Sequence, residues 1–238
     1  MEDTLAKAKY AAMVWNIPLS ESHANDLLER LNLPGASSIV DIGCGWGELL
    51  LRATALSGPD VKATGIDIDQ DLLGRAKRNA EERKITAEFV QQRGADFRGT
   101  ADRAICLGSS HVLGGTRAML SRLAEIVPRG RVLVGDMFWE RPPTEEAKAI
   151  FGDEALPLAD LAALCREAGW EVLYLTTADQ REWDDFESCH RAGPREWLLE
   201  NPEDPAAADV REEMDRRERE YLTVYRGVVG YAFLVLGH

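Results

Sequence analysis

The chain has 238 residues, 45% of them hydrophobic and 29% charged, a composition typical of one globular domain with additions. Its formal net charge of −13 counts against nucleic acid or an anionic membrane as a partner, because both bind basic patches. The sequence has no apolar run of about 18 residues or more, and its acidic start, Met1-Glu2-Asp3, is unlike a signal peptide. We therefore expect a cytoplasmic protein.

Cysteine and histidine are sparse and scattered. The four cysteines, at positions 44, 106, 165 and 189, form no C-x-x-C pair, and the four histidines have no metal-ligand spacing with them or with one another. This pattern predicts reduced thiols and no metal site.

Two helices are predicted before the first strand. Residues 2–15 and 20–31 both have helical spacing of apolar positions, and Ser20 is a plausible N-cap for the second. Pro34-Gly35 ends this lead-in.

A glycine-rich turn follows. Ile39 and Val40 lead into Asp41, after which glycines at 43, 45 and 47 alternate with Cys44 and Trp46. The pattern predicts a strand that ends near Ile42 and a helix over 48–57. Glycines at such a turn allow a ligand to approach the backbone closely.

A second acidic strand end lies about 20 residues further on. The apolar stretch 61–68 contains Asp67, and Asp69 stands where the N-cap of a helix over 70–84 belongs. An acid at this distance from a glycine turn is placed to accept hydrogen bonds from ribose hydroxyls. We infer a nucleoside-binding α/β domain.

Strands and helices alternate through the rest of the chain, which predicts a doubly wound, mostly parallel sheet. Residues 179–226 are helical in pattern, with breaks predicted at Gly193-Pro194 and Asn201-Pro202. The further strands are expected at 87–91, 104–107, 131–135, 171–177 and 228–236, and the further helices at 116–127, 144–151 and 157–168.

The G-x-G-x-G spacing after Asp41, together with Asp67, resembles motif I and the second strand end of the class I S-adenosylmethionine-dependent methyltransferases. The resemblance covers about residues 36–178 and 228–236. It implies a Rossmann-like sheet of seven strands in the order 3-2-1-4-5-7-6, with the last strand antiparallel. One methyltransferase domain is expected, with a helical lead-in over 1–35, a core over 36–178 and 228–238, and a helical cap over 179–227.

The resemblance also implies a binding site for S-adenosyl-L-methionine. The turn holds the methionine end, Asp41 assists at the amino group through water, and Asp67 binds the ribose. The family usually places Asp-Ala at the adenine edge, where this chain has Arg93-Gly94-Ala95-Asp96, so either Arg93 or Asp96 takes the acidic position. The predicted cofactor residues are Asp41, Gly43, Cys44, Gly45, Asp67, Ile68, Gly94, Ala95, Asp96 and Leu107.

His111 is the first candidate for a general base. It lies four residues past Leu107, where the fourth strand should leave the sheet beside the transferred methyl group, and histidine is the residue type suited to proton removal near neutral pH. Asp136 and Glu187 are its rivals. The alternative is that His111 caps the helix that starts near Thr116 or forms a structural hydrogen bond within the loop.

The predicted substrate pocket contains Ser109, His111, Trp139 and Trp183. The tryptophans at 15, 46, 139, 183 and 197 all lie outside the predicted strands. They could line an apolar pocket, or they could form the small core that holds the cap in place.

The leading functional hypothesis is methyl transfer to a small molecule, with no nucleic-acid or membrane partner. The fourth strand ends in Gly-Ser-Ser-His instead of the Asn/Asp-Pro-Pro-aromatic motif of enzymes that methylate amino groups of nucleic acids. One alternative is a nicotinamide-dependent oxidoreductase on a Rossmann sheet. The other is a binding protein that keeps the methyltransferase fold without turnover.

Overall fold

A computed structural model describes residues 5, 8–152 and 155–238. Its contacts divide the chain into two compact units. The sheet unit comprises residues 20–138, 156–177 and 231–238, and the helical unit comprises the described residues of 1–19, 139–155 and 178–230. The predicted boundaries of lead-in, core and cap stay a prediction.

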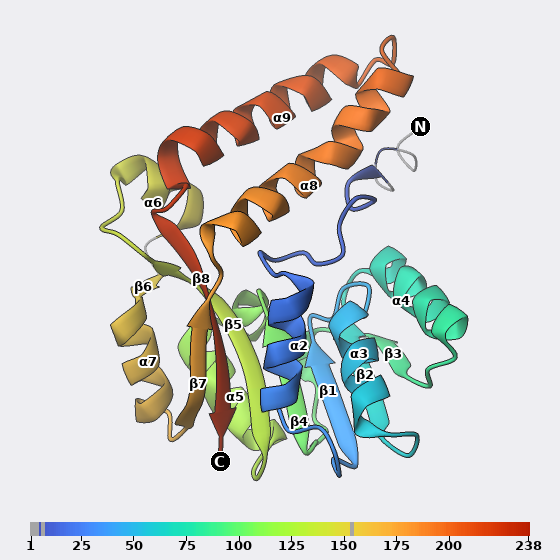
Figure 1. Ribbon diagram of the computed structural model, residues 1–238, viewed down its shortest axis with the longest axis vertical. Coiled ribbons are helices and arrows are strands. Elements are labelled where there is room, and N and C mark those ends of the chain that lie inside the picture. Colours follow the sequence, from blue (N-terminus) through green and yellow to red (C-terminus); the bar gives the residue numbers. More distant parts are fainter. Residues whose placement is uncertain (1–4, 6–7, 153–154) are drawn as a thin grey trace. The chain divides into compact units, whose positions relative to one another are not determined.

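The sheet confirms the predicted strand order (Figure 1). Its strands run in the order β3-β2-β1-β4-β5-β8-β7; β1 to β5 pair in parallel, and β7 and β8 pair antiparallel. A two-residue strand, β6, pairs with β5 outside this path and adds to the seven expected. The strands are β1 Ser38–Ile42, β2 Lys62–Asp67, β3 Glu88–Gln91, β4 Arg103–Leu107, β5 Arg131–Trp139, β6 Leu156–Pro157, β7 Glu171–Thr177 and β8 Val229–Gly237.

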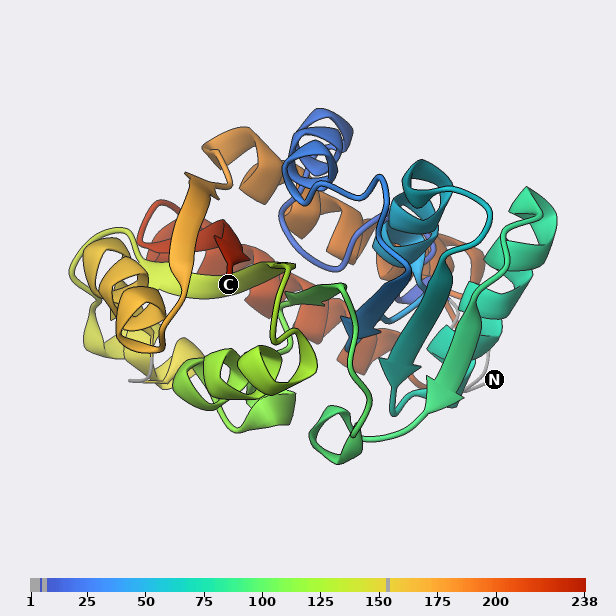
Figure 2. The same ribbon diagram turned by 90° about the horizontal axis from the view of Figure 1, so that it is seen from below.

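Helices cover both faces of the sheet (Figure 2). One face carries α2 (Glu21–Arg30), α3 (Glu48–Ser57) and α4 (Gln70–Arg83), and the other carries α5 (Thr116–Ile126) and α7 (Leu158–Glu167). The β3–β4 connection forms only a 3₁₀ turn, η1 (Gly94–Asp96), and a second such turn, η2 (Ser110–Leu113), precedes α5.

Capping residues set two of these helix starts as predicted. The Ser20 side chain accepts a hydrogen bond from the amide of His23, and the Asp69 carboxylate accepts from the amides of Asp71 and Leu72. Such bonds satisfy amides that have no partner inside the helix.

The main core lies between the sheet and the α5–α7 face. It contains the inward side chains of β1, β4, β5 and β8 together with those of both helices. Trp170 is fully buried there and donates its indole N–H to the carbonyl of Leu120 at 3.1 Å. The packing fixes the strand ends from which the candidate site is built.

The helical unit is organised around α8 (Gln180–Glu200) and α9 (Ala207–Glu220), which run side by side (Figure 1). A π-helical turn, η3 (Tyr221–Tyr225), follows α9, and α6 (Glu145–Phe151) belongs to the same unit. Its apolar core consists of Trp197, Leu198, Ala207, Val210 and Met214.

The break predicted at Gly193-Pro194 is wrong, whereas the one at Asn201-Pro202 is confirmed. Helix α8 continues through Pro194, although proline lacks an amide donor. Both residues are buried, and a Cβ on Gly193 would lie 1.9 Å from the carbonyl oxygen of Ala8. Close packing of the chain at this turn offsets the cost of the proline.

Two further predictions need correction. Residues 9–18 form turns and bends instead of continuing the helix predicted over 2–15, of which residues 1–4, 6 and 7 lie outside the described chain. The fifth strand also runs four residues further than expected, so Trp139 is its last residue and does not lie outside the strands. The polar residue Asp136 interrupts the apolar run there and hides the extension.

Candidate cofactor and acceptor site

The glycine turn is tied to the neighbouring strand. The amides of Gly43 and Cys44 donate to the carbonyl of Ile66 at 2.8 and 3.0 Å, and the amide of Gly47 donates to the carbonyl of Cys44 at 2.9 Å. All three glycines have positive φ, at 76°, 52° and 72°. Other residues rarely adopt this conformation, which explains why the turn alternates glycine with other types.

The three glycines meet different surroundings. A Cβ on Gly43 would lie 2.1 Å from Ser109 Oγ, and one on Gly47 would lie 2.8 Å from the ring of Phe89. A Cβ on Gly45 would meet no atom within 4 Å. The first and third glycines therefore permit packing, and Gly45 is the position where a ligand can approach the backbone.

Asp67 connects the end of β2 to the glycine turn. Its Oδ2 accepts from the amide of Gly45 at 2.8 Å, and its Oδ1 accepts from the amide of Asp69 at 3.0 Å. The side chain is half-buried. Because each carboxylate oxygen can accept a second hydrogen bond, Asp67 retains capacity for two hydroxyl donors.

Asp41 is a buried carboxyl at the end of β1, only 4% exposed. Burial raises its pKa to about 8, and the negative charge of Asp67 adds to this effect. Burial and both carboxylates also raise the pKa of the Cys44 thiol, which stays protonated. A cation placed beside Asp41 would therefore be stabilised as the carboxyl ionises.

The end of β3 joins the same edge through η1. Gly94 packs so closely that a Cβ would lie 2.7 Å from Ile42 and 3.2 Å from Val112 of η2. Ala95 is half-buried, whereas Asp96 and Ile68 are exposed. The structure brings this loop to the end of β1, and its adenine-binding register stays a prediction.

The end of β4 carries Ser109 and His111. Ser109 is buried against Gly43, and its hydroxyl donates to the carbonyl of Leu107 at 3.3 Å. His111 is exposed within η2. Helix α5 begins after Gly115 with no side-chain cap, so the alternative that His111 caps this helix is wrong.

Asp136 lies in β5, beside the β4 end. Its Oδ2 accepts a hydrogen bond from the Thr116 hydroxyl at 2.6 Å, and its Oδ1 accepts from the amide of Met137 at 2.9 Å. No short-range pattern in the sequence pairs Thr116 with Asp136, because the two residues are 20 positions apart.

Known proteins resemble the chain along almost its whole length. Residues 39–130 match the family model of a methyltransferase domain. The Escherichia coli protein YjhP is 30% identical over 229 residues, or 92% of each chain. The SAM-dependent methyltransferases of Geobacter sulfurreducens and Thiobacillus denitrificans, both solved with S-adenosyl-L-homocysteine, are 27% and 29% identical. Their TM-scores are 0.88 and 0.87, with 98% of this chain and 96% and 97% of theirs covered.

The chain belongs to the class I S-adenosylmethionine-dependent methyltransferases. This membership decides against the nicotinamide-dependent alternative. Among its described residues, the methyltransferase has no helix long and apolar enough to cross a membrane.

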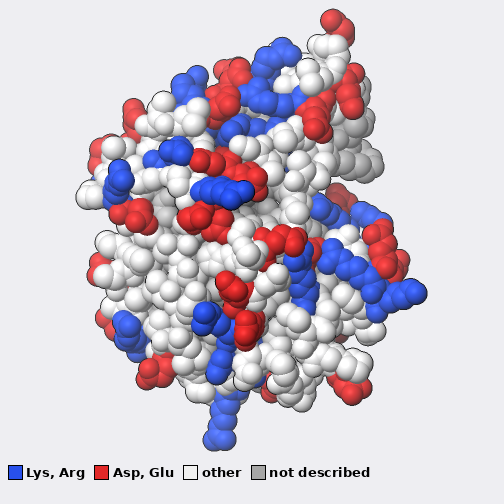
Figure 3. Space-filling view, viewed as in Figure 1, with Lys and Arg blue, Asp and Glu red and all other residues white. Residues whose placement is uncertain are grey.

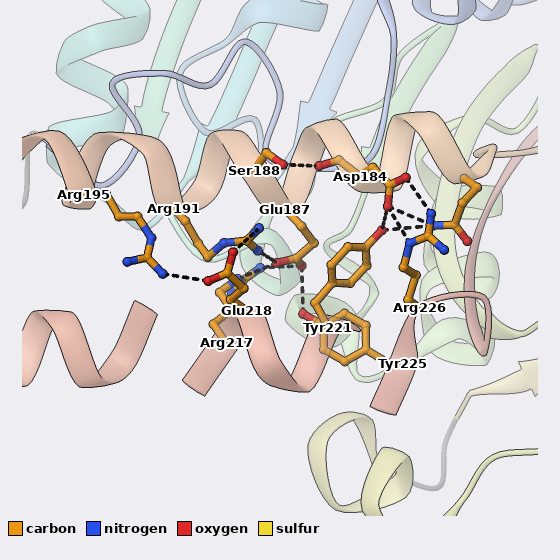
Figure 4. A network of polar contacts seen from close by, with 11 residues as sticks. Asp184, Glu187, Ser188, Arg191, Arg195, Arg217, Glu218, Tyr221, Tyr225 and Arg226 are labelled. Carbon is orange, nitrogen blue, oxygen red and sulfur yellow. Dashed lines mark hydrogen bonds and ion pairs between the residues drawn. The ribbon is translucent and has the colours of Figure 1, made fainter. Parts of the chain in front are cut away.

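Three residues of the methyltransferase that were predicted to belong to the acceptor pocket or to act as a base lie in its helical unit. Trp139 is in edge-to-face contact with Phe151, and Trp183 is buried, with its ring 6.0 Å from that of Phe186. The carboxylate of Glu187 is engaged with arginines (Figure 4). The roles of the two tryptophans in an acceptor pocket stay predictions, and the partners of Glu187 favour a structural role over that of a base.

Proposed function

We propose that this methyltransferase transfers the methyl group of S-adenosylmethionine to a small-molecule acceptor beyond the ends of β1, β2 and β4. One observation carries the proposal: the open backbone at Gly45 is hydrogen-bonded to Asp67 and lies on the turn that follows the buried Asp41 of β1. The turn thus combines close backbone approach, a hydroxyl-binding carboxylate and a carboxyl that favours a cation. A nucleoside with a cationic amino-acid end matches all three features, because it has ribose hydroxyls, a positive group and a chain that can lie against the backbone.

The proposed cofactor contacts combine this geometry with the roles that the family resemblance implies. Asp67 binds the ribose hydroxyls, Gly45 lies against the methionine end, and Asp41 interacts with the ammonium group through water. Gly94 and Ala95 border the adenine. The S-adenosyl-L-homocysteine in the two solved methyltransferases supports a nucleoside ligand of this kind.

The acceptor is assigned from charge. With a net charge of −13 the chain does not favour the polyanionic backbone of nucleic acids. Figure 3 shows Lys and Arg side chains interleaved with Asp and Glu on the face in view, instead of gathered into a basic surface. Both observations favour a small acceptor.

The chemistry asks little of the protein beyond positioning. S-adenosylmethionine supplies an electrophilic methyl group on a sulfonium sulfur. The residues at the β4 and β5 ends hold the acceptor in line and exclude water, and a base is needed only if the nucleophile carries a proton. His111 is the better candidate base, because its side chain is exposed whereas Asp136 is engaged by Thr116.

The cofactor assignment is tested by calorimetry with S-adenosyl-L-homocysteine. Asp67→Ala removes an acceptor of charged hydrogen bonds and should weaken binding by about 1.5–3 kcal/mol, roughly 10- to 150-fold. Asp60→Ala, which removes an exposed carboxylate of the same unit, is the control and should bind as the wild type does. Equal affinities for all three proteins would contradict the assignment.

The acceptor class is tested by label transfer. The protein is incubated with S-adenosylmethionine that carries a deuterated methyl group and with a small-molecule extract of bacterial cells, and products are found by mass spectrometry. Label in a small molecule supports the proposal. Binding of S-adenosyl-L-homocysteine without any label transfer would favour the binding protein without turnover.

The same assay tests His111. If it is the base, His111→Ala and His111→Gln should lower label transfer at least tenfold, about 1.4 kcal/mol of barrier, without changing cofactor affinity. A smaller decrease would leave His111 without a role in proton transfer.

A further inference from the structure

Tyr231 carries a hydroxyl group that is buried beside the carboxyl end of β4 and the middle of β5. The residue belongs to β8 and is 3% exposed. A Cβ on Gly135 of β5 would lie 2.8 Å from the phenol oxygen and 2.7 Å from Leu107 Cδ2. Leu107 and Gly135 are partners in the β4–β5 register, so the phenol reaches the last residues of β4.

The hydroxyl has no hydrogen-bond partner among the described residues. The amide of Gly108 faces the phenol oxygen and also donates to the carbonyl of Gly135 at 3.1 Å, but an N–H group cannot accept the phenol proton. A buried hydroxyl without a partner costs folding free energy, and phenylalanine would fill the same space without this cost. The stability of the fold therefore does not explain why position 231 carries a tyrosine hydroxyl.

The surroundings of Tyr231 keep its phenol group protonated, so that it can donate a hydrogen bond. Burial raises its pKa well above the usual range, and the negative charge of Asp136 acts in the same direction. The phenol thus retains its proton near neutral pH. A buried O–H group of this kind is satisfied by a lone pair on a ligand oxygen or nitrogen.

We propose that the Tyr231 hydroxyl donates a hydrogen bond to an oxygen or nitrogen of the methyl acceptor at the carboxyl end of β4. This inference rests on the proposed function, which places a small acceptor at that edge. It narrows the substrate class to molecules with a polar atom beside the reacting centre. Tyr231 binds and orients the acceptor, and no covalent step passes through it.

The position in the sheet favours the acceptor over the cofactor as the ligand. β8 is separated from β1 by β4 and β5, which places it about 14 Å from the strand of the glycine turn. The phenol extends over β5 toward β4 and not as far as Asp67 or Gly45. The reacting end of the site is therefore closer to Tyr231 than the nucleoside end.

The test compares Tyr231→Phe with the wild type in three measurements. Thermal stability without ligand should be unchanged or higher, because the lost O–H group donates to no described residue. Calorimetric affinity for S-adenosyl-L-homocysteine should stay within twofold. Transfer of the deuterated methyl group to the molecule labelled in the cell extract should fall about tenfold, as expected for one buried hydrogen bond to substrate.

Two matched variants serve as controls. Tyr221→Phe removes a hydroxyl that donates to Asp184 at 2.6 Å, and it should lower the melting temperature. Tyr174→Phe removes a hydroxyl from β7 but retains the ring beneath Arg30, and it should leave all three measurements unchanged.

Each contrary result has a distinct meaning. A loss of stability in Tyr231→Phe as large as in Tyr221→Phe would show a structural partner, such as an internal water, and overturn the inference. A tenfold loss of S-adenosyl-L-homocysteine affinity would overturn it in favour of a cofactor contact. Undiminished label transfer by Tyr231→Phe would overturn the inference and leave the proposed function standing. Absence of label transfer by the wild type would overturn both the inference and the proposed function.

Discussion

The two compact units each bury a carboxyl group, and they surround it in opposite ways. Asp41 in the sheet unit has the negative charge of Asp67 nearby, and its pKa is raised to about 8. Glu187 in the helical unit, 1% exposed, accepts two hydrogen bonds from the Arg217 guanidinium, each 2.9 Å long. Tyr225 and Arg191 also donate to it, at 3.0 and 3.4 Å (Figure 4).

The difference separates a structural site from a functional one. A buried carboxylate is stable when it is paired and hydrogen-bonded, which Glu187 already is. The surroundings of Asp41 favour the neutral form, so its ionised form requires a positive group that the chain itself does not place there among the described residues. The incomplete electrostatics of Asp41 therefore indicates where a cationic ligand binds, and the complete network around Glu187 indicates where helices are joined.

The largest effect is expected for Glu187→Ala. The substitution leaves the charges of Arg217 and Arg191 without their buried partner, and we expect a loss of about 3–5 kcal/mol in the free energy of unfolding of the helical unit. Urea denaturation followed by circular dichroism measures it. A loss below about 1 kcal/mol would mean that Glu187 is not the centre of this network.

Asp41→Asn should have a smaller effect on the free energy of unfolding, and it should stabilise the protein relative to the wild type as pH rises. The Asp41 carboxyl ionises near 3.8 in the unfolded chain and near 8 in the folded one. Between these values the folded state holds a proton that the unfolded state lacks, so wild-type stability falls as pH rises through this window and levels off above it. Compared with the variant, the wild type should lose at least about 1 kcal/mol between about pH 5 and about pH 7.5.

Denaturation at both pH values checks this prediction. Asp60→Asn, in an exposed loop of the same unit, should follow the wild-type pH dependence. A constant difference between Asp41→Asn and the wild type would show that the folded state does not raise the pKa of Asp41.

The smallest effect is expected for Arg216→Ala. Arg216 pairs with Glu220 one turn along α9, at 3.2 Å, and its side chain is 54% exposed. Solvent screens such pairs, so the loss should stay below about 0.5 kcal/mol. Against Glu187→Ala, this variant separates the contribution of burial from that of an ion pair as such. Similar losses of stability in Arg216→Ala and Glu187→Ala would mean that burial adds nothing to the contribution of an ion pair.

Local patterns predicted the sheet well. The strand ends at Ile42 and Leu107 follow β-branched or apolar runs and precede glycine, and the alternation with helices leaves few topologies. The same patterns located the glycine turn, Asp67 and the Asp69 cap. These features depend on residues close together in the chain, which is why the sequence reveals them.

The remaining features depend on contacts between distant residues. Glu187 and Arg217 are 30 residues apart, and no local pattern indicates that they pair rather than that Glu187 acts as a base. The glycine motif indicated that a ligand approaches Gly47. In the structure Gly47 instead makes room for the ring of Phe89. Tyr231 resembled an ordinary apolar strand residue, because only the fold shows that its O–H group has no acceptor in the described part of the chain.

The place of β8 in the sheet bears on how the chain folds as it is synthesised. β7 is made before β8 yet lies outside it, since β8 inserts between β5 and β7. Until residues 229–237 have been made, both neighbours present open strand edges, and every residue of β8 is buried once it is in place. Open edges of this kind pair readily with other chains. The nascent protein is therefore most prone to aggregation just before β8 joins the sheet.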